Sequence, residues 1–155
     1  MFIPETCIEE HLTGSNYLIA LQFIRFLRER GLTFERDEGF WKNKIYFYIK
    51  NGDRCIAYLA VCDPNEPENR WTVWSDDMDL SHIGADAVSD DIRTLAWQYV
   101  DTCGNCGSCG GGVPKVIFGR EFPRVCGCTF RVDNADEKAL GFLKEMVRMA
   151  MGDLE

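Results

Sequence analysis

The sequence has very few histidines and none of the short motifs that mark common catalytic sites. Only His11 and His82 occur among 155 residues, and no local signature pairs either of them with a nucleophilic cysteine. The patterns Ser-x-x-Lys, Gly-x-Ser-x-Gly and Gly-x4-Gly-Lys-Ser/Thr are all absent from the chain. The sequence therefore identifies no reaction and no catalytic residue of these classes.

Long apolar runs are also missing. No stretch approaches the about 18 apolar residues that a membrane-spanning helix needs. Met1–Glu10 lacks the basic start and the apolar run of a secretory signal. We therefore expect no membrane partner and a cytoplasmic location. In that compartment the eight cysteines are expected to be reduced thiols or metal ligands rather than disulfides.

Positive charge is scarce relative to negative charge. The chain has 17 Lys and Arg against 25 Asp and Glu, a net charge of −8 at pH 7. Residues 63–91 concentrate this imbalance, with nine carboxylates against the one fixed positive charge of Arg70. Such a field repels phosphate backbones, so we expect no direct nucleic-acid partner. We interpret the acidic run as a solvated surface loop.

What the chain does have is a cluster of cysteines in residues 102–129. Five of the eight lie there, interleaved with glycines: Cys103, Cys106, Cys109, Cys126 and Cys128. Cysteines two residues apart on a Gly-rich turn can converge on one ion. A glycine after the second cysteine allows the backbone to aim N–H groups at the sulfurs, which stabilises thiolate charge. The segment therefore predicts a metal site.

Two sets of four ligands are compatible with this spacing. The first, which we favour slightly because it uses the third cysteine of the turn, is Cys103, Cys106, Cys109 and Cys126. The second pairs Cys103 and Cys106 with Cys126 and Cys128, because residues 126 and 128 would share one face of a strand. A site filled by four cysteines has no open position for a substrate, so it predicts a structural role.

Zinc is the first choice of metal. The same Cys-x2-Cys-x2-Cys run with a distant fourth cysteine also suits a [4Fe–4S] cluster, which would make the chain a redox protein. Unligated thiols, a redox disulfide or small packing residues are the remaining interpretation, although five free thiols would be prone to oxidation. Of the other cysteines, Cys55 and Cys62 are expected in the core, and Cys7 is expected to be unrelated to His11.

Periodicity and turn signals predict one α+β domain over residues 1–155, with three helices on a mainly antiparallel sheet of five or six strands. The helices are expected at 15–30, 90–101 and 135–151, and the cysteine loop follows the second helix. Cys103 continues the apolar stripe of that helix, which places it at the helix end. Strands are expected at 32–36, 44–49, 54–61, 70–74, 115–118 and 124–132, with a hairpin turn at Asn51-Gly52.

Aromatic residues are numerous in the first half of the chain. Rings on one sheet face could line a pocket for an apolar or planar ligand, although ordinary packing explains most such sets. The residues concerned are Phe34, Phe40, Trp41, Tyr46, Phe47, Tyr48, Tyr58, Trp71 and Trp74. An enzyme acting in an aromatic-lined cleft, with carboxylates that the sequence does not single out, is the third functional hypothesis.

Several segments together resemble an uncharacterised family of small bacterial cysteine-rich α+β proteins. The segments are GLTFERDEGFWKNK, NRWTVWSDDM, CGNCGSCGGG, IFGREF and VCGCTFRVDN. The resemblance implies a stand-alone domain or a partner of regulatory proteins, and it brings no reaction, cofactor or catalytic residue with it. By fold-level analogy, such a domain could bind a small-molecule effector.

Overall fold

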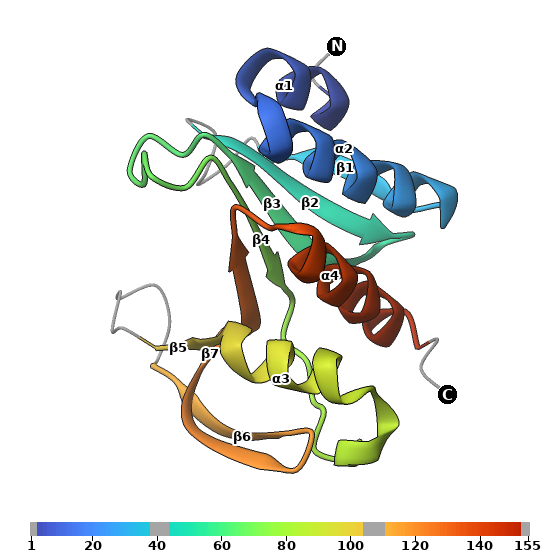
Figure 1. Cartoon of the computed structure of the whole chain (residues 1–155), viewed down its shortest axis with the longest axis vertical. Coiled ribbons are helices and arrows are strands. Elements are labelled where there is room, and N and C mark those ends of the chain that lie inside the picture. The colour runs from blue at the N-terminus through green and yellow to red at the C-terminus, as the bar shows by residue number, and fades with distance from the viewer. Residues whose placement is uncertain (1–2, 38–43, 104–110, 153–155) are drawn as a thin grey trace.

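The computed structural model describes residues 3–37, 44–103 and 111–152. Four α-helices and one antiparallel sheet of seven strands lie within these residues, as Figure 1 shows. The helices are α1 (Pro4–His11), α2 (Gly14–Glu29), α3 (Asp90–Tyr99) and α4 (Glu137–Ala150), with a short 3-10 helix at Ala85–Ala87. The strands are β1 (Thr33–Arg36), β2 (Ile45–Asn51), β3 (Arg54–Val61), β4 (Trp71–Ser75), β5 (Val100–Thr102), β6 (Val113–Ile117) and β7 (Arg120–Asp133).

The predicted α+β class and antiparallel sheet are confirmed, and the predicted number of elements is too low. The extra helix is α1, which starts with Pro4 at its first turn, a position where proline costs no hydrogen bond. The extra strand is β5, which is only three residues long and forms by pairing with β7. Neither element has a periodic pattern long enough to be recognised from sequence.

The sheet is built mostly from neighbours in the chain. Its order is β1-β2-β3-β4-β7-β5, with β6 paired to β7 off this path. The predicted hairpin between β2 and β3 is present, and its two turn residues are 52 and 53, one position later than predicted. Asn51 pairs with Arg54, and Gly52 has a positive φ of 64°. The hairpin of β6 and β7 turns at Phe118 and Gly119, both with positive φ, as a tight two-residue hairpin turn requires.

Helices cover one face of the sheet. α1, α2 and α4 lie over the strands β1 to β4 in Figure 1, and α3 packs against α4 and β7. The side chains between these layers form the core, including the fully buried rings of Phe23, Phe47, Trp71, Phe130 and Phe142. Burial of this apolar surface is the main stabilising contribution to the fold.

The ends of two predicted helices differ from expectation. α3 ends at Tyr99 rather than at residue 101, because the chain then becomes the strand β5. The expectation that Cys103 continues the helical stripe is therefore wrong, and Cys103 instead follows a strand. α4 begins at Glu137 rather than at residue 135, and it is capped by Asp136, whose side chain accepts from the N–H of Ala139.

Within the described residues, none of the helices is both long and apolar enough to cross a membrane.

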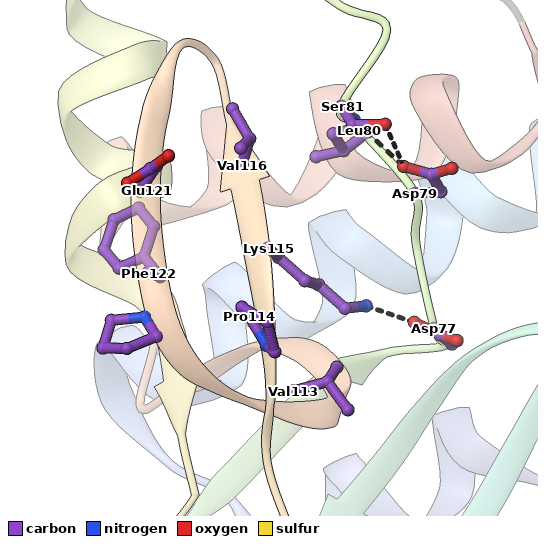
Figure 2. A pocket seen from close by; sticks show the side chains of 11 residues that line it. Asp77, Asp79, Leu80, Ser81, Val113, Pro114, Lys115, Val116, Glu121 and Phe122 are labelled. Carbon is purple, nitrogen blue, oxygen red and sulfur yellow. Dashed lines mark hydrogen bonds and ion pairs between the residues drawn. The ribbon is translucent and has the colours of Figure 1, made fainter.

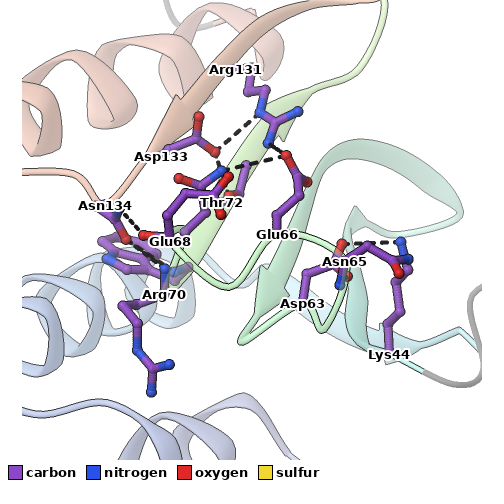
Figure 3. A network of polar contacts seen from close by, with 12 residues as sticks. Lys44, Asp63, Asn65, Glu66, Glu68, Arg70, Thr72, Arg131, Asp133 and Asn134 are labelled. Carbon is purple, nitrogen blue, oxygen red and sulfur yellow. Dashed lines mark hydrogen bonds and ion pairs between the residues drawn. The ribbon is translucent and has the colours of Figure 1, made fainter. Parts of the chain in front are cut away.

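The acidic segment is more ordered than a solvated loop would be. Asp63 is buried, with only 7% of its surface exposed, and it forms an ion pair with Lys44 at 3.0 Å. Glu66 pairs with Arg131 at 2.6 Å, and Figure 3 shows both pairs in one polar network. Part of the negative charge predicted to face solvent is therefore neutralised by Arg131 of β7 and by Lys44, the residue before β2.

Candidate metal centre

β7 bends where it passes from one part of the sheet to another. Its last residues pair with β4, and its earlier residues pair with β5 and β6. At the bend Thr129 has a positive φ of 64°, which is uncommon for a β-branched residue. The buried hydroxyl of Ser75 holds this conformation, because it donates to the carbonyl of Cys128 and accepts from the N–H of Phe130 at 3.1 Å.

The bend coincides with a bulge that contains two of the predicted cysteines. Val100 pairs with Phe130 and Thr102 pairs with Val125, so two steps along β5 correspond to five steps along β7. Residues 126–129 therefore lie opposite Asp101 alone. The Cys126 thiol lies close enough to the Asp101 carboxylate and to the Cys128 thiol to affect the pKa of both.

Cys103 lies beside the same part of β7. Its backbone N–H donates to the carbonyl of Arg124 at 2.9 Å, which continues the register set by Thr102 and Val125. In an antiparallel ladder, residues that face each other share a side of the sheet, and alternate residues along a strand do too. By this register Cys103 lies opposite Arg124, two residues along β7 from Cys126, which begins the bulge.

Gly112 packs closely against Cys103, and the two residues lie on either side of segment 104–110 in the sequence. A Cβ atom on Gly112 would lie 2.7 Å from the Cβ of Cys103 and 2.8 Å from the carbonyl carbon of Arg124. Only glycine allows so close an approach. The predicted ligands Cys106 and Cys109 belong to this segment and lie outside the described residues.

The surroundings of the bulge disfavour negative charge. Burial raises the pKa of Cys128 to about 12, with a further contribution from the neighbouring Cys126 and Asp101. Burial likewise raises the pKa of Asp101. Thiols and a carboxylate held this close repel one another once ionised, and a bound cation would relieve that repulsion.

The described residues contain two or three of the predicted ligands and no complete site. Over residues 3–37, 44–103 and 111–152, no group of three or more His, Cys, Asp or Glu side chains is arranged to hold a metal ion. Cys103, Cys126 and Cys128 form no disulfide with another described cysteine. Each predicted ligand set thus depends on at least one cysteine of segment 104–110.

The remaining cysteines lie elsewhere. Cys7 lies in α1 and is buried, with 2% of its surface exposed, whereas His11 on the same helix is exposed. Cys55 is half-buried, and its thiol donates to the carbonyl of Ala57 at 3.3 Å. Cys62 is half-buried at the edge of the core, with its thiol 3.8 Å from the carbonyl oxygen of His11.

The aromatic residues of the first half divide between the two faces of the sheet. Phe47 and Trp71 are buried beneath the helices, and Phe34 packs edge-on against Phe47. The half-buried rings on the opposite face contact one another at centroid distances of 5.8 to 6.1 Å. These rings are Tyr46, Tyr48, Tyr58 and Trp74. Phe40 and Trp41 lie outside the described residues.

The tyrosines of this face donate to carboxylates. The Tyr48 hydroxyl donates to Asp37, which helps to raise the pKa of Tyr48 to about 12. The Tyr58 hydroxyl donates to Asp76 at 2.9 Å, and burial together with this bond raises its pKa. These hydroxyls are protonated at neutral pH and act as hydrogen-bond donors.

Comparison with protein-family models, with curated proteins and with solved structures gives no significant match.

Proposed function

We propose that this chain is a non-catalytic cytoplasmic domain in which one zinc ion joins the end of β5 to β7. The ligands in this proposal are Cys103, Cys106, Cys109 and Cys126, with Cys128 as the alternative to Cys109. The observation that supports it is the register of β5 and β7, in which Cys103 lies opposite Arg124, two residues along β7 from Cys126.

The separation along this register is compatible with a tetrahedral ion. In a regular antiparallel pair, positions related in this way are about 7–8 Å apart at their Cα atoms and closer at their Cβ atoms. Two sulfurs bound to zinc at about 2.3 Å lie roughly 3.8 Å from each other. Side chains at positions this far apart can reach a common ion.

The close packing of Gly112 against Cys103 also supports the proposal. It holds Cys103 and Gly112 together, one on each side of segment 104–110 in the sequence, and Cys106 is three residues from Cys103 in the chain. Four cysteine ligands would fill the coordination sphere, which is the arrangement of structural zinc sites. Such a site can contribute about 10 kcal/mol or more to folding at neutral pH.

The cytoplasmic location follows from the chemistry of the ligands. Zinc binds thiolates and not disulfides, and the reducing cytoplasm keeps thiols available.

The test is the metal content of the protein purified under anaerobic, reducing conditions, measured by elemental analysis and native mass spectrometry. We expect one zinc per chain, lost in Cys103→Ser and Cys126→Ser and retained in Cys55→Ser. The Cys55 variant is the matched control, because serine can make the same bond to Ala57. Zinc lost in Cys109→Ser and kept in Cys128→Ser selects the first ligand set, and the reverse selects the second.

Two outcomes would contradict the zinc proposal. A brown protein that absorbs near 400 nm and contains iron and sulfide would show a [4Fe–4S] cluster instead. A chain that carries no metal and unfolds identically with and without a strong chelator would show that the cysteines hold no structural ion.

A further inference from the structure

A cavity of about 710 Å³ lies between the segment Asp77–Ser81 and the β6–β7 hairpin. Figure 2 shows the hairpin on one side and the segment on the other, with the Lys115 side chain reaching across to Asp77. None of the described cysteines lines this cavity. Its volume falls within the range of about 300–1,000 Å³ that is typical of small-molecule sites.

The walls of the cavity are largely apolar. They comprise Leu80, Val113, Pro114, Val116, Phe122 and Pro123. Val113 is 50% exposed, and among the described residues Leu18 is the other large apolar side chain with so much exposed surface. Apolar walls with a few polar groups at the rim favour a ligand with an apolar body.

Lys115, the one cation among the described residues that line the cavity, is already engaged. The Lys115 ammonium forms an ion pair with Asp77 and donates to the Met78 carbonyl at 3.2 Å and to the Thr129 hydroxyl at 2.9 Å. An ammonium has three donors, and these three contacts use all of them. Lys115 is therefore unsuited to binding an anionic ligand, and its charge is balanced by Asp77.

Two further carboxylates give the cavity a negative charge. Asp79 and Glu121 also line it. Hydrogen bonds from the hydroxyl and the N–H of Ser81, at 2.6 and 3.1 Å, lower the pKa of Asp79, which is ionised at neutral pH. Glu121 is exposed and forms no ion pair with another described residue. The charge that complements this rim is positive.

The free edge of β6 is poorly suited to pairing with a peptide strand. β6 has five residues, and Pro114 has no N–H to donate to a partner. A short edge strand that contains proline is a common defence against strand addition. A small molecule fits the cavity better than an extended peptide does.

We propose that this cavity binds a small organic cation, an amine or amidine joined to an apolar body. The apolar body contacts Val113, Pro114 and Phe122, and the cation lies near Glu121 and Asp79. The site is independent of the zinc proposal, because none of its residues is a proposed ligand.

The test is a titration of isotope-labelled full-length protein, followed by NMR, with three probes of similar shape. The probes are 2-phenylethylammonium, 2-phenylethanol and 3-phenylpropionate. We expect the ammonium to bind most tightly and to shift the amide signals of Val113, Lys115, Val116, Glu121 and Phe122. In Glu121→Gln its affinity is expected to fall about twofold to fivefold, as for a partly exposed charge pair.

Glu10→Gln is the matched control, since it changes the net charge equally on α1, at the opposite end of the molecule from β6 in Figure 1. It is expected to bind the ammonium as the parent does. Three results would overturn the proposal: equal or tighter binding of the carboxylate probe, no shift at these residues with 2-phenylethylammonium at millimolar concentration, or binding only of an extended basic peptide along β6.

Discussion

The Cβ of Cys103 lies 2.7 Å from the position that a Cβ atom on Gly112 would occupy. Real Cβ atoms do not approach this closely, so the contact exists only because residue 112 is glycine. The contact joins Cys103, which follows β5, to Gly112, which precedes β6. The strands β5 and β6 both pair with β7 at Val125. It therefore fixes Cys103 and Gly112 relative to each other, one before and one after the Gly-rich cysteine segment in the sequence.

We predict that Gly112→Ala destabilises the protein by about 1–3 kcal/mol, the usual cost of forcing an extra carbon into a packed site. The atoms it would strike include the backbone of Arg124, which cannot rotate away. The free energy of unfolding in urea measures the effect, and zinc content should fall in parallel if Cys103 is a ligand.

Gly141→Ala is the control for this prediction. Gly141 lies inside α4, and an added Cβ there meets nothing within 4 Å. Alanine is favoured over glycine in a helix by about 1 kcal/mol, so this variant should be more stable than the parent. A Gly112→Ala protein as stable as the parent would contradict the tight contact with Cys103.

We predict that Ser75→Ala destabilises the protein by about 1–3 kcal/mol, because it leaves buried hydrogen-bonding groups without a partner. Ser75 is fully buried, and its hydroxyl bonds to Cys128 and Phe130 on either side of the bend in β7. Urea unfolding measures the change. Ser15→Ala, an exposed position in the first turn of α2, should differ little from the parent; equal effects at both sites would show that the buried hydroxyl is not needed.

We predict that Asn134→Ala lowers the free energy of unfolding more than Asn134→Asp does. Its side-chain oxygen accepts from the N–H of Arg70 at 2.7 Å, its amide donates to the Glu68 carbonyl at 3.1 Å, and its φ is 48°. Figure 3 shows it joining the loop before β4 to the end of β7. Asn134→Ala loses both hydrogen bonds and disfavours this φ. We expect it to lower the free energy of unfolding by about 2 kcal/mol.

Asn134→Asp keeps the acceptor and tolerates the backbone conformation, so it should lose less stability than Asn134→Ala. Thermal or urea unfolding of the two variants gives the comparison. If aspartate is as damaging as alanine, the bond to Glu68 rather than the bond to Arg70 is the important one.

The ion pair between Glu5 and Arg28 is predicted to make a small, pH-dependent contribution to stability. Arg28 donates to both carboxylate oxygens, at 2.9 and 3.1 Å, and this lowers the pKa of Glu5 below its ordinary value. Because the folded-state pKa is the lower one, the stabilisation is complete above the unfolded pKa of about 4.3 and is lost as the pH falls through the folded value.

Glu5→Gln should therefore cost about 0.5 kcal/mol at pH 7, the range of partly exposed pairs, and nothing once the carboxyl is protonated. Urea unfolding of parent and variant at pH 7 and at pH 3 measures both values. Glu9→Gln, a matched change on the same helix, should show no such pH-dependent difference. A deficit in Glu5→Gln that persists at low pH would argue for lost packing rather than a lost ion pair.

Some elements could be predicted because their signals are local. The alternating residues of β2 and β3 with Gly52 between them define a hairpin without help from the rest of the chain. The long apolar stripe of α2, followed by Gly31 with a φ of 78°, defines a helix and its end in the same way. In such segments short-range sterics and burial favour the same conformation.

The environment of the cysteines depended on contacts between distant segments. Residues 100–102 have a helical pattern in the sequence, and pairing with β7 makes them a strand. The bulge at 126–129 depends on Ser75 and on a positive φ at Thr129, which no residue preference indicates. The strands predicted at 115–118 and 124–132 form a hairpin, and its second strand is longer than predicted, continuous from 120 to 133.

The sequence alone therefore determined the class of fold and the identity of the thiols, since composition and periodicity are properties of the chain itself. The tertiary structure decided which thiols are neighbours and where a ligand-sized cavity forms. Strand register and bulges are set by hydrogen bonds between residues far apart in the chain, so a local pattern does not contain that information.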